Sequence, residues 1–308
     1  MSGLLDRIRR AASPPLHTLS PVQARAAYEA AAEVLDLPRA PLQLVQDFTL
    51  PGGDGQPRVA RRYATGPGPR PTLLYLHGGG FVIGSINTHD SLCRQLALRS
   101  GWAVVSLDYR LAPEHPFPAA VDDTWAALQA LAAEAGALRQ PVAVGGDSAG
   151  GTLAAVAALL ARNHRLPLAL QLLITPGTTA HADTPSHRFF GSGFLLDAVT
   201  IDWMFDHTIP RHLRCDWRFA PLLADADGVA PACLLLAECD PLVDEGLAYG
   251  DHLRAAGVPV ALELYRGLTH DFIKMGRALK EAQHAMDAAA HAMMAAQHQH
   301  ASAIGKAT

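Results

Sequence analysis

The chain alternates between short apolar runs and longer segments with helical periodicity. The runs are almost continuously hydrophobic, which is typical of strands buried on both faces of a parallel sheet. Because helical segments separate most of the runs, the pattern predicts a mostly parallel sheet covered by helices on both faces. The runs lie near residues 72–76, 103–107, 141–145, 169–174, 232–237 and 260–265, and the helices are expected at about 88–100, 118–135, 149–163 and 243–256.

The first 65 residues add a helix and two strands to this alternation. Ser20 followed by Pro21 and Gln23 combines an N-cap serine, a proline at the first helical position and a capping-box glutamine. This signal predicts a helix that runs to about Leu35. Residues 42–50 and 58–65 are expected to be strands on either side of a glycine-rich turn. We therefore predict the α/β class, with eight strands in a single domain over residues 1–308.

A long segment between residues 174 and 232 interrupts the alternation. A helix is predicted within it from Asp197, as N-cap, to about His207. We interpret residues 180–217 as a cap over the functional site, completed by residues 1–40; a second packing layer without a role in binding is the alternative. The segment holds a large share of the chain's aromatic residues, namely Phe189, Phe190, Phe194, Trp203, Phe205 and Trp217.

Composition argues against several classes of protein. Of the 308 residues, 49% are hydrophobic and 18% are charged, which is enough apolar material for one large core. The net charge of −4 and the scattered basic residues disfavour a nucleic-acid partner. The longest apolar stretch, Leu153 to Ala161, is about half as long as a transmembrane helix. No apolar signal segment opens the chain, so we expect no membrane partner.

Four cysteines occur in the sequence, and their spacing fits neither a zinc site nor a disulfide framework. They are Cys93, Cys215, Cys233 and Cys239. This pattern predicts free thiols and a location in the cytoplasm.

The candidate nucleophile is Ser148, within Gly146-Asp147-Ser148-Ala149-Gly150. This G-x-S-x-G pattern comes directly after a predicted strand and directly before a predicted helix, as a nucleophile elbow requires. Glycines beside the serine let the helix pack close to the strand in a sharp turn. The helix N-terminus also directs the positive end of its dipole at a developing oxyanion. A phosphate-binding loop is the alternative, but no Lys-Ser or Lys-Thr pair follows the glycines.

A serine nucleophile needs a base, and the base needs an acid that orients it. When the nucleophile lies on such an elbow, the acid and then the histidine follow later strands. Asp240 comes after the run 232–237, and His270 comes after the run 260–265. Asp244 competes as the acid, but it lies inside the next expected helix. We therefore predict Asp240 and His270.

Acyl transfer also needs hydrogen-bond donors for the tetrahedral oxyanion. The glycines Gly78, Gly79 and Gly80 follow the strand predicted at 72–76, and no side chain screens their amides. We expect these amides, with the amide of Ala149, to form the oxyanion hole; a flexible turn is the alternative. His77 is interpreted as a structural residue that holds the loop by a hydrogen bond.

Histidines recur near the C-terminus at seven-residue spacing, at His284, His291 and His298. This spacing places them on one helix face. No set of carboxylates or cysteines joins them, so we expect no metal site. The segment is interpreted as a frayed helix and a disordered tail.

Taken together, these motifs resemble the hormone-sensitive-lipase family of α/β-hydrolases. The resemblance covers roughly residues 40–290 and rests on five segments: His77–Phe81, Asp108–Ala120, Gly146–Gly151, Asp240–Glu245 and Tyr265–Phe272. It implies an α/β-hydrolase fold with an N-terminal cap and a carboxylic ester hydrolase for short- to medium-chain acyl esters, without a cofactor. It also implies the triad Ser148, Asp240 and His270, with Gly79, Gly80 and Ala149 as oxyanion donors.

Two segments depart from the family pattern. Thr175-Pro176-Gly177 stands where the family usually has Tyr-Pro, and Arg218-Phe219-Ala220 precedes Pro221 where a small residue is common. Both departures are expected to reshape the acyl or alcohol pocket. An amidase or lactonase with the same triad, and a non-catalytic small-molecule binding protein on the same fold, stay open as alternatives. The run 260–265 is a candidate edge strand, and similar proteins pair there, so a homodimer is the partner prediction beside the ester substrate.

Overall fold

In the computed structural model, which describes residues 1–11 and 14–307 and the side chains as far as Ser302, eight strands form one sheet. The order is β1-β2-β4-β3-β5-β6-β7-β8. β2 pairs antiparallel with β1 and β4, and the remaining neighbours are parallel. The predicted sheet is therefore confirmed. The strands are β1 (Leu44–Pro51), β2 (Pro57–Ala64), β3 (Thr72–Leu76), β4 (Ala103–Leu107), β5 (Val142–Asp147), β6 (Gln171–Ile174), β7 (Ala232–Cys239) and β8 (Val260–Thr269).

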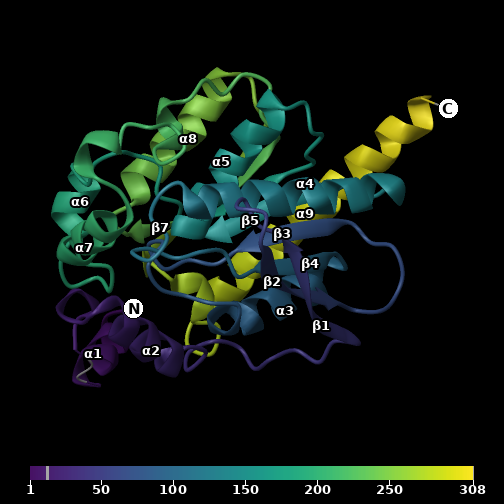
Figure 1. Cartoon of the computed structure of the whole chain (residues 1–308). Coiled ribbons are helices and arrows are strands. Elements are labelled where there is room, and N and C mark those ends of the chain that lie inside the picture. The colour runs from purple at the N-terminus through teal and green to yellow at the C-terminus, as the bar shows by residue number, and fades with distance from the viewer. Residues whose placement is uncertain (12–13, 308) are drawn as a thin grey trace.

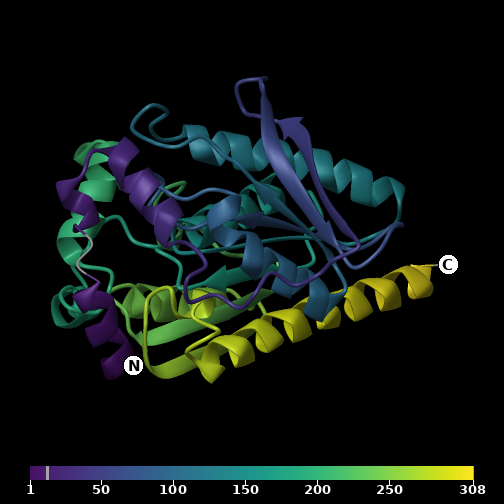
Figure 2. The ribbon, with the colours of Figure 1, turned by 90° about the horizontal axis from the view of Figure 1, so that it is seen from below.

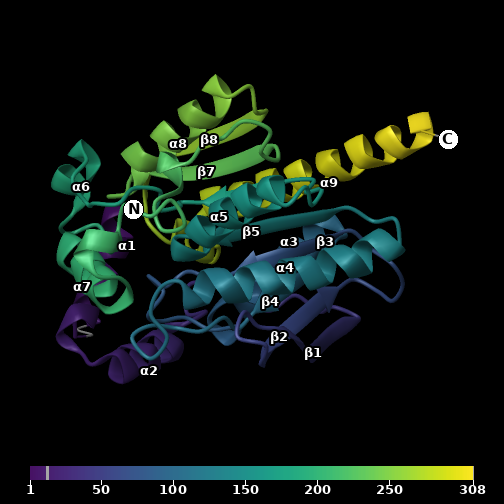
Figure 3. The ribbon, with the colours of Figure 1, turned by 45° about the horizontal axis from the view of Figure 1, so that its top comes forward.

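The helices lie in two layers, one on each face of the sheet (Figures 1 and 3). α4, α5 and α8 cover one face, and α3 and α9 cover the other, as the view from below also shows (Figure 2). The α-helices are α1 (Ser2–Arg10), α2 (Pro21–Ala31), α3 (Asp90–Ser100), α4 (Ala119–Ala137), α5 (Ala149–Asn163), α6 (Pro185–Phe190), α7 (Ala198–Thr208), α8 (Val243–Ala255) and α9 (Lys280–Ala307). None of the described helices combines the length and the apolar character that a membrane span requires.

Each central strand contributes to both cores because successive side chains point to opposite faces. In β3, Leu74 and Leu76 pack beneath α4 and α5, whereas Leu73 and Tyr75 pack beneath α3 and α9. This double burial explains why the strands appear in the sequence as continuous apolar runs. β5 and β8 extend beyond the runs predicted for them, to Asp147 and Thr269, because backbone pairing continues past the last apolar side chain.

The N-terminal helices and the segment that contains α6 and α7 lie together at one end of the sheet (Figures 1 and 3). Two hydrogen bonds join them: Arg9 Nη2 donates to Gly193 O at 2.6 Å, and His17 Nδ1 lies 3.2 Å from Thr200 Oγ1. The capping box at Ser20 is present, although α2 ends at Ala31, before the predicted end. α7 begins after its N-cap Asp197, as the sequence predicted.

The C-terminal segment corrects one prediction. Instead of a frayed helix and a disordered tail, the chain forms α9, a helix of 28 residues. Ala289 and Met293 are fully buried in the core that α9 shares with α3. The spaced histidines lie on the opposite, exposed face of this helix. The prediction was wrong because it weighed the exposed histidines and not the apolar stripe on the other side of the same helix.

Shortening Met293 tests whether α9 is part of the core. Met293→Ala leaves a cavity at a fully buried position, and we expect it to lower the free energy of unfolding by about 2–4 kcal/mol. His291→Ala, on the exposed face of the same helix, should change stability by no more than about 0.5 kcal/mol. Urea unfolding followed by circular dichroism measures both values. Equal stabilities of the two variants would contradict the packing of α9.

Candidate active site

Ser148 lies at the turn between β5 and α5, with backbone angles φ 54° and ψ −123°. A positive φ is strained for a residue with a side chain, and two hydrogen bonds hold it. The Ser148 amide donates to Ile174 O at 2.9 Å, and Ser148 O accepts from the Thr152 amide at 3.0 Å. The structure thus has the strand-turn-helix geometry that the G-x-S-x-G pattern predicted.

The glycines of the elbow are required by a close approach of two backbones. A Cβ on Gly150 would lie 1.9 Å from Leu76 O, and one on Gly146 would lie 2.4 Å from the same oxygen. Both distances are far inside van der Waals contact, so a larger residue at either position would push α5 away from β3. The absence of these two side chains lets the loop after β3 come close to Ser148.

The three residues predicted to act together are hydrogen-bonded in a chain. His270 Nε2 lies 2.9 Å from Ser148 Oγ, and His270 Nδ1 donates to Asp240 Oδ2 at 2.7 Å. The other carboxylate oxygen of Asp240 accepts from the Leu242 amide at 2.9 Å. Asp244, the competing acid, instead accepts from the Ser186 amide at 2.8 Å. The geometry therefore agrees with the choice of Asp240.

The environment of His270 favours its protonated form. The residue is only 4% exposed, and burial by itself lowers the pKa of an imidazole. The charge of Asp240 and its hydrogen bond outweigh burial, so they raise the pKa of His270 to about 9. An imidazole with a raised pKa is a stronger base toward the serine hydroxyl.

The four amides expected to form the oxyanion hole are not equivalent. The Gly78 amide donates to Asp147 Oδ1 at 3.1 Å, so this donor is already used inside the protein. Among the described residues, the amides of Gly79, Gly80 and Ala149 make no backbone hydrogen bond outside helices and strands. Gly79 and Gly80 have positive φ values of 126° and 58°. Gly78 is therefore removed from the candidate donors, and the other three remain.

Asp147 is a buried carboxylate that the sequence prediction did not single out. It accepts from Tyr75 Oη at 2.6 Å and from the Gly78 amide, and His89 Nε2 lies 3.1 Å away. Burial raises the pKa of a carboxyl group, but His89 and the hydrogen bond from Tyr75 hold the pKa of Asp147 well below its usual range. The sequence does contain a signal for a buried, hydrogen-bonded carboxylate, because Asp147 is a charged residue at the end of a buried strand.

His77 has the structural role that was predicted for it. Its Nδ1 donates to Gly78 O at 2.8 Å, and its ring stacks on that of Tyr109. Burial, reinforced by the charge of His89, lowers the pKa of His77 to about 3, so the ring is neutral. His77 thus stiffens the start of the glycine loop.

A small apolar cavity of about 40 Å³ opens beside Ser148. The segment 180–217 contributes four of its walls, Leu196, Ile201, Met204 and Phe205. Gly177 and Phe219, from the two segments that depart from the family pattern, also line it. The departures therefore lie where they affect the shape of this cavity.

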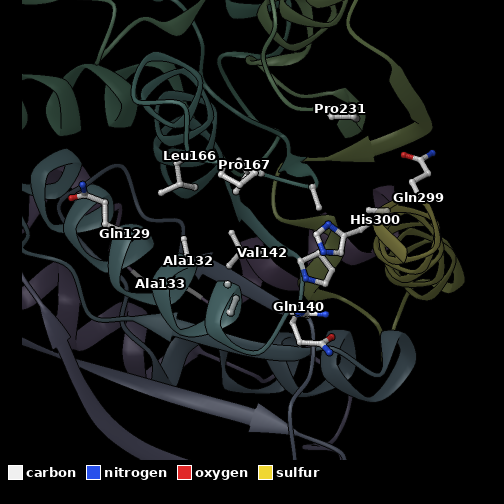
Figure 4. Close-up of a pocket in the computed structure, with 17 residues that line it drawn as sticks. Gln129, Ala132, Ala133, Gln140, Val142, Leu166, Pro167, Pro231, Gln299 and His300 are labelled. Carbon is white, nitrogen blue, oxygen red and sulfur yellow. The ribbon is translucent and has the colours of Figure 1, made fainter. Parts of the chain in front are cut away.

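A much larger surface cavity, of about 950 Å³, lies elsewhere (Figure 4). Val142, at the start of β5, lines it, whereas Ser148 follows the other end of the same strand. Alanines, prolines and leucines make up most of its lining, and the polar side chains that join them are Gln129, Arg139, Gln140, Gln299 and His300. Its size does not mark it as the functional site, because the hydrogen-bonded Ser, His and Asp side chains lie at the opposite end of β5.

No group of three or more metal-ligating side chains occurs among the residues that the structure describes. His284, His291 and His298 are all exposed along α9. The four cysteines are free, and Cys93 and Cys233 are buried.

Comparison with known proteins assigns the chain to a family. Residues 73–274 match a family described as having the alpha/beta hydrolase fold. An ethyl acetate hydrolase from Pseudomonas putida is 41% identical over 285 residues, which cover 88% of this chain and 89% of that protein. The carboxylesterase NlhH from Mycobacterium tuberculosis is 41% identical over 70% of each chain.

Solved structures agree with these sequence matches. An esterase from the archaeon Pyrobaculum calidifontis is 34% identical, with a TM-score of 0.89 over 95% of this chain and 96% of the other. EstE1, a thermostable carboxylesterase from a metagenomic library, is 36% identical, with a TM-score of 0.86 over 91% and 98%. With this fold, these motifs and these relatives, the chain belongs to the hormone-sensitive-lipase family of α/β-hydrolases.

Proposed function

We propose that this protein is a carboxylic ester hydrolase that works through an acyl-enzyme on Ser148. The observation that carries the proposal is the chain of two short hydrogen bonds from Asp240 through His270 to Ser148 Oγ. Gly80 lines the same cavity as Ser148, and relatives named as ester hydrolases support the same activity. Acyl transfer uses this combination of a nucleophile, a base and oxyanion donors.

The reaction divides into two displacements. Ser148 Oγ attacks the acyl carbonyl while His270 Nε2 takes the hydroxyl proton, and the tetrahedral oxyanion accepts hydrogen bonds from Gly79, Gly80 and Ala149. The ester C–O bond then breaks as His270 returns the proton to the leaving alcohol. Water, deprotonated by His270, attacks the acyl-enzyme and releases the carboxylic acid. Asp240 orients the imidazole throughout and stabilises its charged form.

The size of the cavity beside Ser148 favours short acyl groups. About 40 Å³ corresponds to the space of only a few water molecules, and its walls are apolar. An acetyl to butyryl group fits this description better than a medium or long chain. The ethyl acetate hydrolase of Pseudomonas putida, by its name, acts on a two-carbon acyl ester, which agrees with this preference.

We assign the cap to residues 1–40 and 180–217 within a single domain of 308 residues. The second of these segments supplies the side chains of α7 that close the acyl cavity. The hydrogen bond between Arg9 and Gly193 connects the two segments. A cap of this kind excludes water and selects substrates by the shape of its inner wall.

Two further predictions concern the assembly and location of the protein. β8 is an edge strand of the sheet, as the sequence predicted, and pairing of two copies along β8 would give the homodimer. The four free thiols fit the reducing conditions of the cytoplasm. An amidase or lactonase would use the same groups; a set of matched esters, amides and lactones distinguishes these activities.

Replacing the nucleophile tests the proposed function directly. Ser148→Ala removes the attacking oxygen, and we expect hydrolysis of p-nitrophenyl butyrate to fall by about 10⁴-fold or more. The wild-type protein, but not the variant, should be labelled by a fluorophosphonate probe. Turnover that survives the substitution would exclude Ser148 as nucleophile. A wild-type protein that binds esters but resists the probe would favour a binding protein.

The raised pKa of His270 predicts the pH dependence of the reaction. A general base must be neutral, so kcat/KM for p-nitrophenyl acetate should rise with pH, reach half of its plateau near pH 9, where half of His270 has lost its proton, and level off above that pH. Asp240→Asn removes the charge that raises this pKa; the rise should move to lower pH, and the plateau should fall by about 10³–10⁴-fold. Asp244→Asn serves as the control, because Asp244 bonds to Ser186. An unshifted profile for Asp240→Asn would remove Asp240 from the triad.

A series of p-nitrophenyl esters tests the acyl cavity. We expect kcat/KM to be highest for acyl groups of about two to four carbons and to decline steadily beyond six. Met204→Ala enlarges the cavity and should move the optimum to a longer chain. Val199→Ala, on the exposed side of the same helix, should leave the optimum unchanged. The cavity is not the acyl site if Met204→Ala and Val199→Ala give the same profile.

A further inference from the structure

Arg25, in the N-terminal helix α2, connects the cap to the loop that contains the oxyanion glycines. Its Nε donates to Val82 O at 2.8 Å, and its Nη2 donates to Ala112 O at 2.7 Å. The guanidinium also forms a bidentate pair with Glu114, with distances of 2.9 and 2.6 Å. One side chain thus joins three segments that are far apart in the sequence.

The loop that Arg25 contacts has an unusual backbone. Gly79, Gly80 and Phe81 all have positive φ values, of 126°, 58° and 65°. A tight turn follows, in which the amides of Val82 and Ile83 both donate to Gly79 O, at 3.1 and 3.0 Å. Positive φ is strained for phenylalanine and persists only where surrounding contacts hold it.

The contacts of Arg25 lie at the end of this strained stretch. The C=O of Val82 and the N–H of Ile83 belong to the same peptide group. Its oxygen accepts from Arg25, and its N–H donates to Gly79 O and closes the turn. Phe81 O accepts from the Ala112 amide at 2.9 Å, and Ala112 O in turn accepts from Arg25. Arg25 therefore holds the turn directly through Val82 and indirectly through Ala112.

Packing around Arg25 fixes its position. The preceding residue, Ala24, is fully buried in a small cluster with Val82, Ile83, Ala112 and Met204. This contact sets α2 against the glycine loop, so the guanidinium next to it meets the two carbonyl groups. A planar guanidinium has several donors in a fixed fork, which suits two carbonyls and a carboxylate at once.

From this geometry, we propose that Arg25 is a positioning residue that holds the Gly79 and Gly80 amides in place for the oxyanion. The inference rests on the proposed ester hydrolysis at Ser148 and adds a specific role for the N-terminal cap. Arg25 does not contact the reacting atoms, and it acts through the turn at Val82. A misplacement of about 1 Å at a catalytic group can lower a rate by about 10²-fold, so a loosened turn affects the rate strongly.

Arg25 makes two kinds of contact, an ion pair with Glu114 and hydrogen bonds to two carbonyls, and mutations distinguish their roles. The side chain of Glu114 is 48% exposed and that of Arg25 is 27% exposed, and an ion pair so open to solvent contributes little to stability. If the pair with Glu114 mattered most, loss of either partner would have the same effect. If the carbonyl contacts matter, only the loss of Arg25 disturbs the glycine loop.

The experiment compares Arg25→Ala, Arg25→Lys and Glu114→Gln on p-nitrophenyl acetate. We expect Arg25→Ala to lower kcat by about tenfold or more with KM within about threefold, since oxyanion donors act in the transition state. Arg25→Lys keeps the charge and the stem but not the fork, and should be intermediate. Glu114→Gln should retain kcat within about twofold. The pH at which activity levels off should be the same in all, because His270 and Asp240 are untouched.

Several results would overturn the role of Arg25. They are an unchanged kcat in Arg25→Ala, an equal loss of kcat in Glu114→Gln, and a raised KM at constant kcat. Thermal unfolding of each variant gives the folded fraction, so a loss of folded protein is separated from a lower rate per folded molecule. Should Arg25→Ala not fold, Arg25→Lys carries the same test. If Arg25→Ala keeps the wild-type rate while Ser148→Ala is inactive, the role of Arg25 is rejected. The proposed ester hydrolysis at Ser148 is then still supported.

Discussion

The approach of the first turn of α5 to the end of β3 is the contact on which the site depends. Only a residue without a Cβ fits at Gly150, where an added carbon would lie 1.9 Å from Leu76 O. The same contact determines two parts of the chemistry. It turns the chain sharply at Ser148, and it brings the loop after Leu76, with its glycine amides, beside the serine. The candidate nucleophile and the candidate oxyanion amides, which follow different strands, thus come together through backbone packing.

The hydrogen bonds of Asp147 fix how the turn at Ser148 and the glycine loop lie relative to each other. It precedes Ser148 and belongs to β5, yet its carboxylate accepts from Gly78 in the loop after β3. Tyr75 donates to the same carboxylate oxygen as Gly78, and His89 contacts the other oxygen. A buried carboxylate is unfavourable unless it is hydrogen-bonded, and here the partners come from β3 with the loop after it and from the residue before α3. Satisfying one charge therefore aligns the elbow with the glycine loop.

The sequence predicted the residues of the proposed triad because each of them follows a strand. In a parallel sheet, the carboxyl ends of the strands meet at one edge, so Ser148, Asp240 and His270 converge without knowledge of the side chains between them. The sequence alone could not show which acceptor each glycine amide binds. Gly78, Gly79 and Gly80 are consecutive glycines, and it is the position of Asp147 in space that distinguishes the amide of Gly78. The full length and the packing of α9 were missed because its buried stripe is formed mostly by alanine and methionine, which resemble the composition of a flexible tail.

The glycine loop is held from two sides by groups of opposite charge. Inside the protein, the carboxylate of Asp147 binds an amide at the start of the loop. Toward the cap, the guanidinium of Arg25 binds a carbonyl at its end. The amide finds its acceptor in the carboxylate, and the carbonyl finds its donor in the guanidinium. Both ends of a strained segment are bound in this way, and the amides of Gly79 and Gly80, between the two anchors, make no backbone hydrogen bond outside the helices and strands of the described residues.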